Sequence, residues 1–281
     1  MSWPAERSSD DRPPRWSIVA RTELTAIWAF ALRNILMGTR NVFFMFELLF
    51  WPVVGVLTIG LMTRFLDVTQ EQRSFVLIGQ MAFSVVGTCQ LDVAYAVLYD
   101  FWSKSMKHQF LAPIGVRHLT IGSWLVGMLR GSLVFALTGI LAWWAFRFDP
   151  LAAGLPATLA LLAGCFLTAW IVGVLVCTLI VLFGGRAETA AWASINLVLA
   201  LAGIYYPVSV LPPPAAAVAS GVPLTYFLDA YRAQFGFPAV YSNAIPTGLA
   251  LAVLYVALSH LALVAAVRRA RRTGQLLKMS E

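Results

Sequence analysis

Six long apolar runs dominate the 281-residue sequence, and each is long enough to cross a lipid bilayer. A transmembrane helix needs about 20 consecutive, mostly apolar residues. The runs are 42–62, 75–98, 119–146, 155–183, 190–211 and 245–267. Because a helix satisfies its own backbone hydrogen bonds within the hydrocarbon, we predict an all-α membrane protein with six transmembrane helices.

The composition excludes several classes of protein. The chain is 60% hydrophobic and 12% charged, with a mean hydropathy of +0.78, whereas a soluble domain is about 45–50% apolar and about 25% charged. A soluble enzyme, a disordered chain and a nucleic-acid-binding domain are therefore excluded. The predicted organisation is an N-terminal segment (1–41), a transmembrane domain (42–267) and a basic tail (268–281), without room for a further globular domain.

The basic residues predict the topology. Of the 20 Lys and Arg residues, 15 lie in segments 1–41, 99–118, 184–189 and 268–281, which six spans place on one side of the membrane. Four lie on the other side, and Arg130 lies within a run. By the positive-inside rule, both termini are cytoplasmic. The N-terminal segment has no cleavable signal peptide, so we expect the first span to direct insertion.

The sequence offers no recognisable catalytic or metal site. Its three cysteines lie within apolar runs, and its three histidines are scattered without metal-ligand spacing. The phosphate-binding motif GxxxxGK[ST] does not occur, so this chain does not bind nucleotide by that device. We expect no catalytic residue, metal or bound cofactor.

Two segments on the predicted cytoplasmic side differ from simple loops. Residues 18–38 alternate apolar and polar positions at helical spacing, which is typical of a helix lying in the headgroup plane. Residues 99–118 combine aromatic residues with charges until Pro113 and Gly115 end the pattern. This second segment predicts either a short amphipathic helix that contacts a soluble partner or a loop that skims the membrane.

A third segment, residues 203–246, is too apolar for an exposed loop and too rich in proline to span. Apolar stretches of about 10 to 14 residues are typical of re-entrant or interfacial segments. Broken backbone at membrane depth survives only where protein or a watery cavity satisfies its polar groups. We therefore predict a re-entrant hairpin over residues 212–235 on the outer side.

Several stretches resemble one transporter family. FGGRAETAAW, GIYYPVSVLPP and VPLTYFLDAYR follow one another from residue 183 to residue 232, and NVFFMFELLFWPVVGVLTIGLMTRFL and WSKSMKHQFLAPIG precede them. In order and spacing they resemble ABC-2 type transporter permeases, the membrane subunits of bacterial ABC exporters. The resemblance extends over about residues 33–268 and implies a multi-pass protein of the bacterial plasma (inner) membrane.

The resemblance also implies partners and site residues. It implies a second copy of the chain or a related permease, and a separate ABC ATPase subunit that holds ATP and Mg. The residues that would couple to this ATPase are Asp100, Phe101, Trp102, Lys104, Lys107, Phe110 and Pro113. The residues of the outer gate motif would be Tyr205, Tyr206, Pro207, Pro212, Pro223, Thr225, Tyr226, Asp229 and Arg232. The family often has an acidic residue followed by Arg at the start of the coupling segment, whereas this chain has Asp100 and Lys104.

Three ionisable residues, Glu47, Asp92 and Arg130, lie within predicted spans. Such groups cost at least about 2.5–3.5 kcal/mol at mid-depth and usually pair or serve transport. Asp92 and Arg130 lie at similar depths in consecutive antiparallel spans, so we predict that Arg130 pairs with Asp92 or Glu47. The pair would serve either helix packing or substrate contact.

The predicted function is therefore the permease of an ATP-driven exporter of an amphipathic or lipid-linked cargo. A glycolipid or polysaccharide precursor is the first candidate, and a drug-like molecule or another lipid is the second. A membrane-embedded enzyme and a channel are the alternatives. The enzyme would need convergent catalytic groups, and the channel would need a ring of polar pore residues.

Overall fold

The computed structural model describes residues 15–40, 42–105 and 115–274, with the side chains of residues 15–21, 42–45 and 47 excepted. All regular elements in these ranges are helical. The principal helices are α1 (Arg15–Arg40), α2 (Val42–Phe65), α3 (Gln70–Trp102), α5 (Val116–Phe146), α6 (Leu155–Phe183), α7 (Glu188–Leu201), α8 (Pro213–Ala219), α9 (Pro223–Ala233) and α10 (Ala244–Arg272). Short 3₁₀ helices are η2 (Pro150–Ala153), η3 (Gly184–Ala187) and η4 (Val208–Val210).

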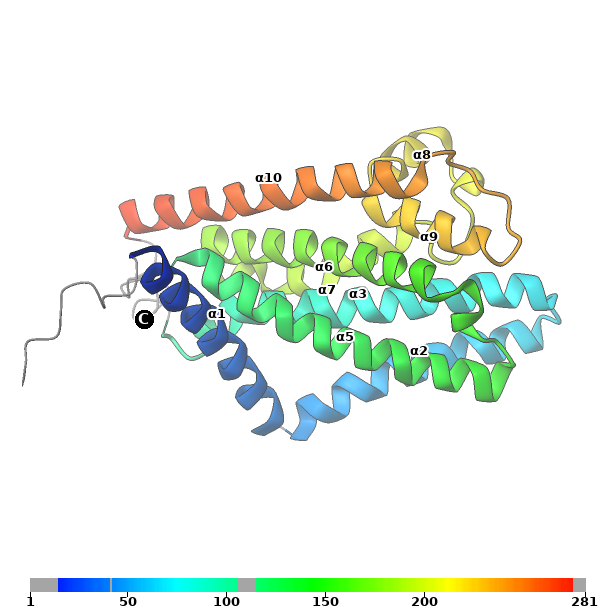
Figure 1. Cartoon of the computed structure of the whole chain (residues 1–281), viewed down its shortest axis with the longest axis horizontal. Helices are drawn as coiled ribbons and strands as arrows, with labels where there is room; N and C mark the ends of the chain where they lie inside the picture. Colours follow the sequence, from blue (N-terminus) through cyan, green and yellow to red (C-terminus); the bar gives the residue numbers. More distant parts are fainter. Residues whose placement is uncertain (1–14, 41, 106–114, 275–281) are drawn as a thin grey trace, which may run out of the picture.

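The long helices lie side by side in a bundle, with α8 and α9 at one end (Figure 1). Within the described ranges, five helical stretches are long and apolar enough to cross a membrane, namely parts of α2, all of α3, α5 and α10, and the continuous stretch α6–η3–α7. The predicted all-α membrane architecture is therefore confirmed for the described part of the chain.

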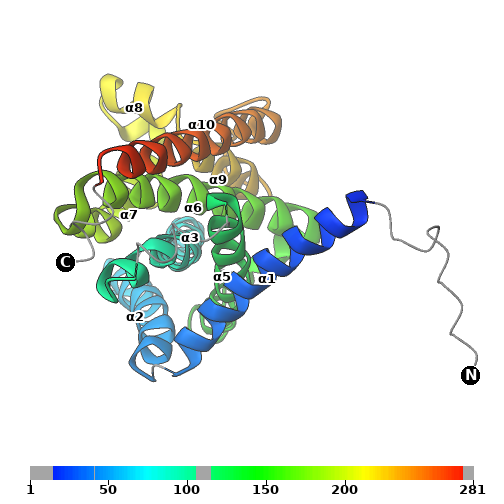
Figure 2. The ribbon, with the colours of Figure 1, turned by 90° about the vertical axis from the view of Figure 1, so that its left-hand side faces the viewer.

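Helix α3 occupies the centre of the bundle. Seen from the end, it is surrounded by α2, α5, α6 and α7 (Figure 2), and it packs most extensively against α5 and α6. Close approach to α6 depends on Gly173, where an added Cβ would lie 2.6 Å from Cβ of Val93 and 2.9 Å from the carbonyl oxygen of Gln90. Small residues that let helix backbones approach are the usual means of helix packing in membranes.

We expect the substitution Gly173→Ala to destabilise the protein by about 1–3 kcal/mol, because the added methyl group overfills this contact. Thermal unfolding of the purified protein in detergent measures the effect. The control is Ala163→Val, which adds volume on an exposed face of the same helix. Equal thermal stability of the two variants would contradict a close α3–α6 contact.

The helix expected over 190–211 is shorter than the sequence suggested. Helix α7 ends at Leu201, after 14 residues, or about 21 Å. Gly203 then adopts a φ of +67°, and the chain bends before Pro207. A left-handed φ ends an α-helix and suits glycine, and proline cannot continue one. Residues 202–207 are therefore a bend that leads into η4.

The proline-rich segment forms two short helices, α8 and α9, joined by a turn. Helix α9 packs against α6 and α10. A Cβ added at Gly164 of α6 would lie 2.3 Å from the ring of Phe227, and one added at Gly248 of α10 would lie 2.9 Å from Cβ of Tyr226. The α8–α9 hairpin therefore packs closely against α6 and α10 at these two glycines.

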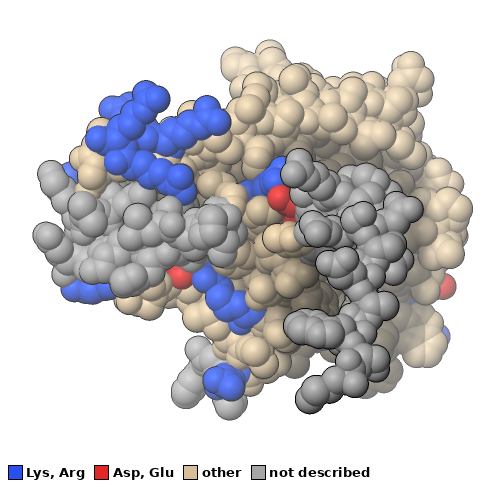
Figure 3. Space-filling model, turned by 60° about the vertical axis from the view of Figure 1, so that its left-hand side comes forward, with Lys and Arg blue, Asp and Glu red and all other residues tan. Residues whose placement is uncertain are grey.

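Helix α1 begins at Arg15, earlier than the expected 18–38, and runs obliquely across the end of the bundle opposite α8 and α9 (Figures 1 and 2). It packs on α5, and Leu24, Trp28, Leu32 and Leu36 form an exposed apolar stripe. Helix α10 ends at the same end of the bundle with Arg269, Arg271 and Arg272. Lys and Arg side chains gather there (Figure 3).

Candidate functional site

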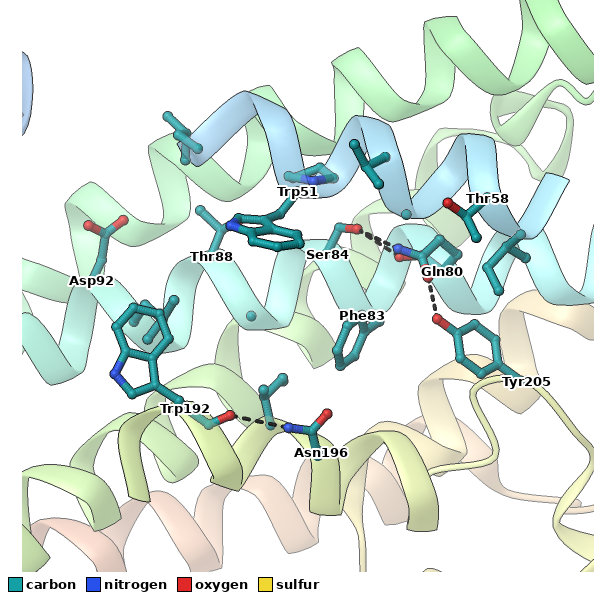
Figure 4. Close-up of a pocket in the computed structure, with 18 of the residues that line it drawn as sticks. Trp51, Thr58, Gln80, Phe83, Ser84, Thr88, Asp92, Trp192, Asn196 and Tyr205 are labelled. Carbon is teal, nitrogen blue, oxygen red and sulfur yellow. Dashed lines mark hydrogen bonds between the residues drawn. The ribbon is translucent and has the colours of Figure 1, made fainter. Parts of the chain in front are cut away.

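A groove of about 680 Å³ opens between α2, α3 and α7. Figure 4 shows Trp51 reaching it from α2 and Trp192 from α7, with Asp92 and Trp192 toward one end and Gln80 and Tyr205 toward the other. Most of its wall is apolar, and the side chains that supply hydroxyl or amide groups are Thr58, Gln80, Ser84, Thr88, Tyr95, Asn196 and Tyr205. The groove is long enough to hold an amphipathic molecule of drug size.

An ion pair lies at the end of this groove that is marked by Asp92 and Trp192, named the inner end. Arg130 of α5 donates from Nη1 to Oδ1 of Asp92, which lines the groove from α3. Arg130 Nη2 also lies 3.4 Å from the carbonyl oxygen of Asn34, whose amide Nδ2 donates to Ser123 Oγ at 2.7 Å. Oδ2 of Asp92 has no hydrogen-bond partner among the described residues. The structure thus places Arg130 against Asp92, the first partner proposed from the sequence, while the side chain of Glu47 lies outside the described residues.

Tyr205 separates the groove from a second cavity, named the outer cavity, at the end of the bundle that carries α8 and α9. Its side chain contributes to the wall of both the groove and this outer cavity of about 480 Å³. The hydroxyl of Tyr205 donates to Oε1 of Gln80, and Nε2 of Gln80 donates to Ser84 Oγ at 3.2 Å. Gly55 of α2 leaves room for this amide, because a Cβ there would lie 2.2 Å from Nε2 of Gln80.

Arg232 stabilises the bend that includes Tyr205. From α9, its guanidinium donates to the carbonyl oxygens of Gly203 at 2.7 Å and Ile204 at 2.6 Å, and to that of Phe75 at 3.1 Å. Its Cζ lies 3.5 Å from the centre of the Phe75 ring. Arg232 is only 5% exposed. One buried cation therefore ties together α9, the bend after α7 and the beginning of α3.

At the opposite end of the bundle, ion pairs connect α1 to the neighbouring helices. Arg33 Nη1 lies 3.1 Å from Oδ1 of Asp100 near the end of α3, and Ser105 Oγ also donates to this oxygen at 3.1 Å. Glu23 accepts from Arg117 Nη2 at 2.6 Å and lies 2.7 Å from Nε2 of His118. The hydrogen bond with His118 lowers the pKa of Glu23. Helix α1 is thereby fastened to both α3 and α5.

Comparison with known families identifies this arrangement. The model of the ABC-2 type transporter family matches residues 25–235, from α1 to α9. The chain belongs to the ABC-2 type transporter family. The match confirms the resemblance of the sequence, and it includes the groove, the bend at Gly203 and the α8–α9 hairpin.

This ABC-2 transporter chain is also similar to an uncharacterized protein of Archaeoglobus fulgidus. The two are 40% identical over 48 residues, which are 17% of this chain and 75% of the relative. Membrane subunits of the ABC-2 family serve transport, and ATP hydrolysis is generally not carried out by them. Among the described residues of this chain, no group of three His, Cys, Asp or Glu could hold a metal ion.

The residues expected to form the outer gate motif lie around the outer cavity and the hairpin. Besides Arg232, four of them make hydrogen bonds with backbone groups: Tyr206 Oη donates to Ala200, Thr225 Oγ1 to Ala219 at 3.1 Å and Tyr226 Oη to Ser220 at 2.7 Å, while Asp229 accepts from Val240 N at 3.1 Å. The three prolines mark element boundaries: Pro207 precedes η4, Pro212 precedes α8 and Pro223 begins α9.

The residues of the ABC-2 coupling segment are only partly described. Asp100, Phe101 and Trp102 are the last residues of α3, Lys104 follows in a turn with a φ of +55°, and Lys107, Phe110 and Pro113 lie outside the described residues. Asp100 is 6% exposed, so its carboxylate faces Arg33 rather than the surface. The coupling role of Asp100 stays a prediction, and within this chain its carboxylate is held by Arg33.

Sequence reasoning missed Gln80, Asn34 and the pairing of Arg33. Gln80 lies within an apolar run without a charge to single it out, and its partner Tyr205 is 125 residues away. Arg33 lies in the amphipathic segment expected over 18–38, and its partner Asp100 is 67 residues away in the sequence. No local pattern of charge connects the two residues.

Proposed function

We propose that this chain is the permease subunit of an ABC exporter and that the groove between α2, α3 and α7 is half of its transport path. The observation that carries the proposal is the groove itself, because it combines polar groups with exposed aromatic walls in a chain of the ABC-2 family. A groove open along one side requires a second subunit to complete a path. A second copy of this chain, or a related permease, would supply the opposite wall.

We further propose that the chain crosses the membrane six times. Two residues of α3, Phe101 and Gly79, contact the segment 184–204. Gly185 lies against the ring of Phe101, and Ile204 lies against Gly79. Gly79 and Phe101 are 22 residues apart, or about 33 Å along a helix, which matches the roughly 30 Å hydrocarbon core. The segment 184–204 would therefore cross as the fifth span, although only part of it is helical. Both termini would then be cytoplasmic, as the basic end of the bundle also favours.

In this proposal, a separate ATPase subunit drives transport from the end of the bundle that carries α1. ATP and Mg would be held by that partner, since the sequence has no phosphate-binding loop. The segment 99–118 would bind the ATPase and move with it. Because Arg33 of α1 pairs with Asp100, this movement would also displace α1. At the other end, Tyr205 and Gln80 would form a gate that opens the groove toward the outer cavity. The cargo would be amphipathic or lipid-linked, with a glycolipid or polysaccharide precursor or a drug-like molecule as candidates.

Coexpression with candidate ATPase subunits tests this proposal. We expect an ATPase to copurify with the chain and its ATP hydrolysis to be stimulated by cargo in reconstituted vesicles. Cargo movement in vesicles should require ATP and both proteins. Transport at an undiminished rate without any ATPase would contradict the proposal and favour a channel.

The Arg33–Asp100 pair gives a sharper test of coupling. We expect Arg33→Glu or Asp100→Arg to lower ATP-driven transport about tenfold, because each places like charges together in a largely buried contact. The double exchange should restore most of the activity. The control is Arg272→Glu, which makes the same change of charge at an exposed position. If the double exchange rescues nothing, the pair does not transmit movement.

A further inference from the structure

The charged side chains that line the described part of the groove are of one sign only. No Lys or Arg side chain is among the described residues that line it, and Asp92 is the one carboxylate that does. Arg130, which pairs with Asp92, belongs to α5 and does not reach the groove wall. The acidic member of the ion pair, Asp92, therefore faces the groove, and the basic member, Arg130, lies on the far side of Asp92 from the groove.

Among the described residues, only one oxygen of the Asp92 carboxylate has a hydrogen-bond partner. Arg130 donates to Oδ1, whereas Oδ2 has no hydrogen-bond partner among the described residues. Asp92 is 3% exposed, so little water screens its charge. In surroundings of low dielectric constant, an anionic ligand near this carboxylate is strongly disfavoured and a cation is attracted.

Aromatic faces reinforce this preference. Trp51 is 62% exposed and Trp192 is 41% exposed, and both side chains line the groove together with Phe83 and Tyr95 (Figure 4). The face of an aromatic ring attracts a cation, most strongly for Trp. The remaining wall is largely aliphatic and would pack against an apolar body.

We propose that the groove selects organic cations with an apolar body and rejects anions of the same shape. The proposal rests on the assignment of the groove to the transport path, and it narrows the cargo to a positively charged amphiphile rather than a precursor linked to a phosphorylated lipid. The charged centre would lie between Trp192 and the inner end of the groove near Asp92. The apolar body would extend toward Phe83.

Binding of two isosteric probes tests the sign of the charge. Tetraphenylphosphonium and tetraphenylborate have nearly the same shape and opposite charges. With the full chain in nanodiscs of uncharged lipid, and after subtraction of binding to empty nanodiscs, we expect the phosphonium to bind at least about tenfold more tightly. Equal binding of the two probes, preference for the borate, or no binding of either would overturn the proposal.

A cation placed in the groove should reduce the preference for the phosphonium. Asn196 lines the groove and is exposed, so Asn196→Lys should be accommodated and should weaken phosphonium binding about tenfold. The matched control Asn196→Gln keeps an uncharged amide and should bind like the wild type. The paired variant Asp92→Asn, Arg130→Gln removes both charges and should bring the two probes closer in affinity.

These measurements need neither ATP nor an ATPase. Phosphonium affinity that is unchanged by Asn196→Lys and by the paired variant would contradict the charge selectivity of the groove, whatever drives transport. Charge-selective binding without ATP-dependent transport in the presence of partner ATPases would instead contradict the proposed exporter function. The two proposals therefore fail by different observations.

Discussion

Replacing Arg130 by methionine should lower the stability of the protein by about 3–5 kcal/mol, because the carboxylate of Asp92 would remain buried without its partner. The pair lies between α3 and α5 and also contacts the backbone of α1 at Asn34. Loss of Arg130 should therefore weaken the packing of α1, α3 and α5 against one another. Thermal unfolding in detergent, followed by loss of helical circular dichroism, measures the effect.

The double variant Asp92→Asn, Arg130→Met provides the decisive comparison. Because no isolated charge remains, we expect it to recover most of the stability that the single variant loses. Exchange of the two residues (Asp92→Arg, Arg130→Asp) should also restore the stability of the protein. If transport recovers with the exchange, the pair serves packing; if stability recovers while transport does not, Asp92 contacts cargo. A double variant as unstable as Arg130→Met alone would show that the ion pair is not the cause.

Replacing Arg232 by methionine should release the bend after α7. Three backbone carbonyls, those of Phe75, Gly203 and Ile204, would lose a charged donor. A hydrogen bond to a charged group contributes about 1.5–3 kcal/mol, and a buried acceptor left unsatisfied costs about 1–3 kcal/mol. We expect a loss of about 3–5 kcal/mol, with the change concentrated at the outer end of the bundle.

Labelling of a cysteine at position 204 measures this release. The side chain of Ile204 and the three native cysteines are buried, so Ile204→Cys should react only slowly with an impermeant maleimide while the bend is held. We expect faster labelling when Arg232→Met is added. Arg232→Lys should be intermediate, because lysine keeps the charge but lacks the planar fork that reaches three carbonyls. Unchanged labelling in both variants would contradict the role of Arg232.

The long helices could be predicted from the sequence because their apolar runs match the thickness of a bilayer. The run 155–183 coincides with α6, and the hairpin predicted from proline and apolar residues lies where α8 and α9 form. The fifth run was predicted ten residues too long, to residue 211 instead of Leu201. Its hydropathy continues through Gly203, whose left-handed φ ends the helix without any change of polarity.

The groove could not be predicted, because apolar side chains face lipid and protein alike in a membrane. In α6, buried Leu161 and exposed Leu159 belong to the same residue type, so periodicity does not distinguish the two faces. The polar contacts that shape the groove join distant residues, such as Gln80 and Tyr205. Only the Arg130–Asp92 pair could be anticipated, because charges are rare within spans and must find a partner.

The position of Arg232 in the chain has a consequence for the order in which the protein is built. The carbonyls of Gly203 and Ile204 receive their donor from a residue 28 or 29 positions further along. During synthesis, Gly203 and Ile204 are therefore added to the chain before their donor exists. The fifth segment therefore cannot settle against α3 with its backbone satisfied until α9 has followed it. A chain truncated before residue 232 would leave the carbonyl oxygens of Gly203 and Ile204 without this charged donor.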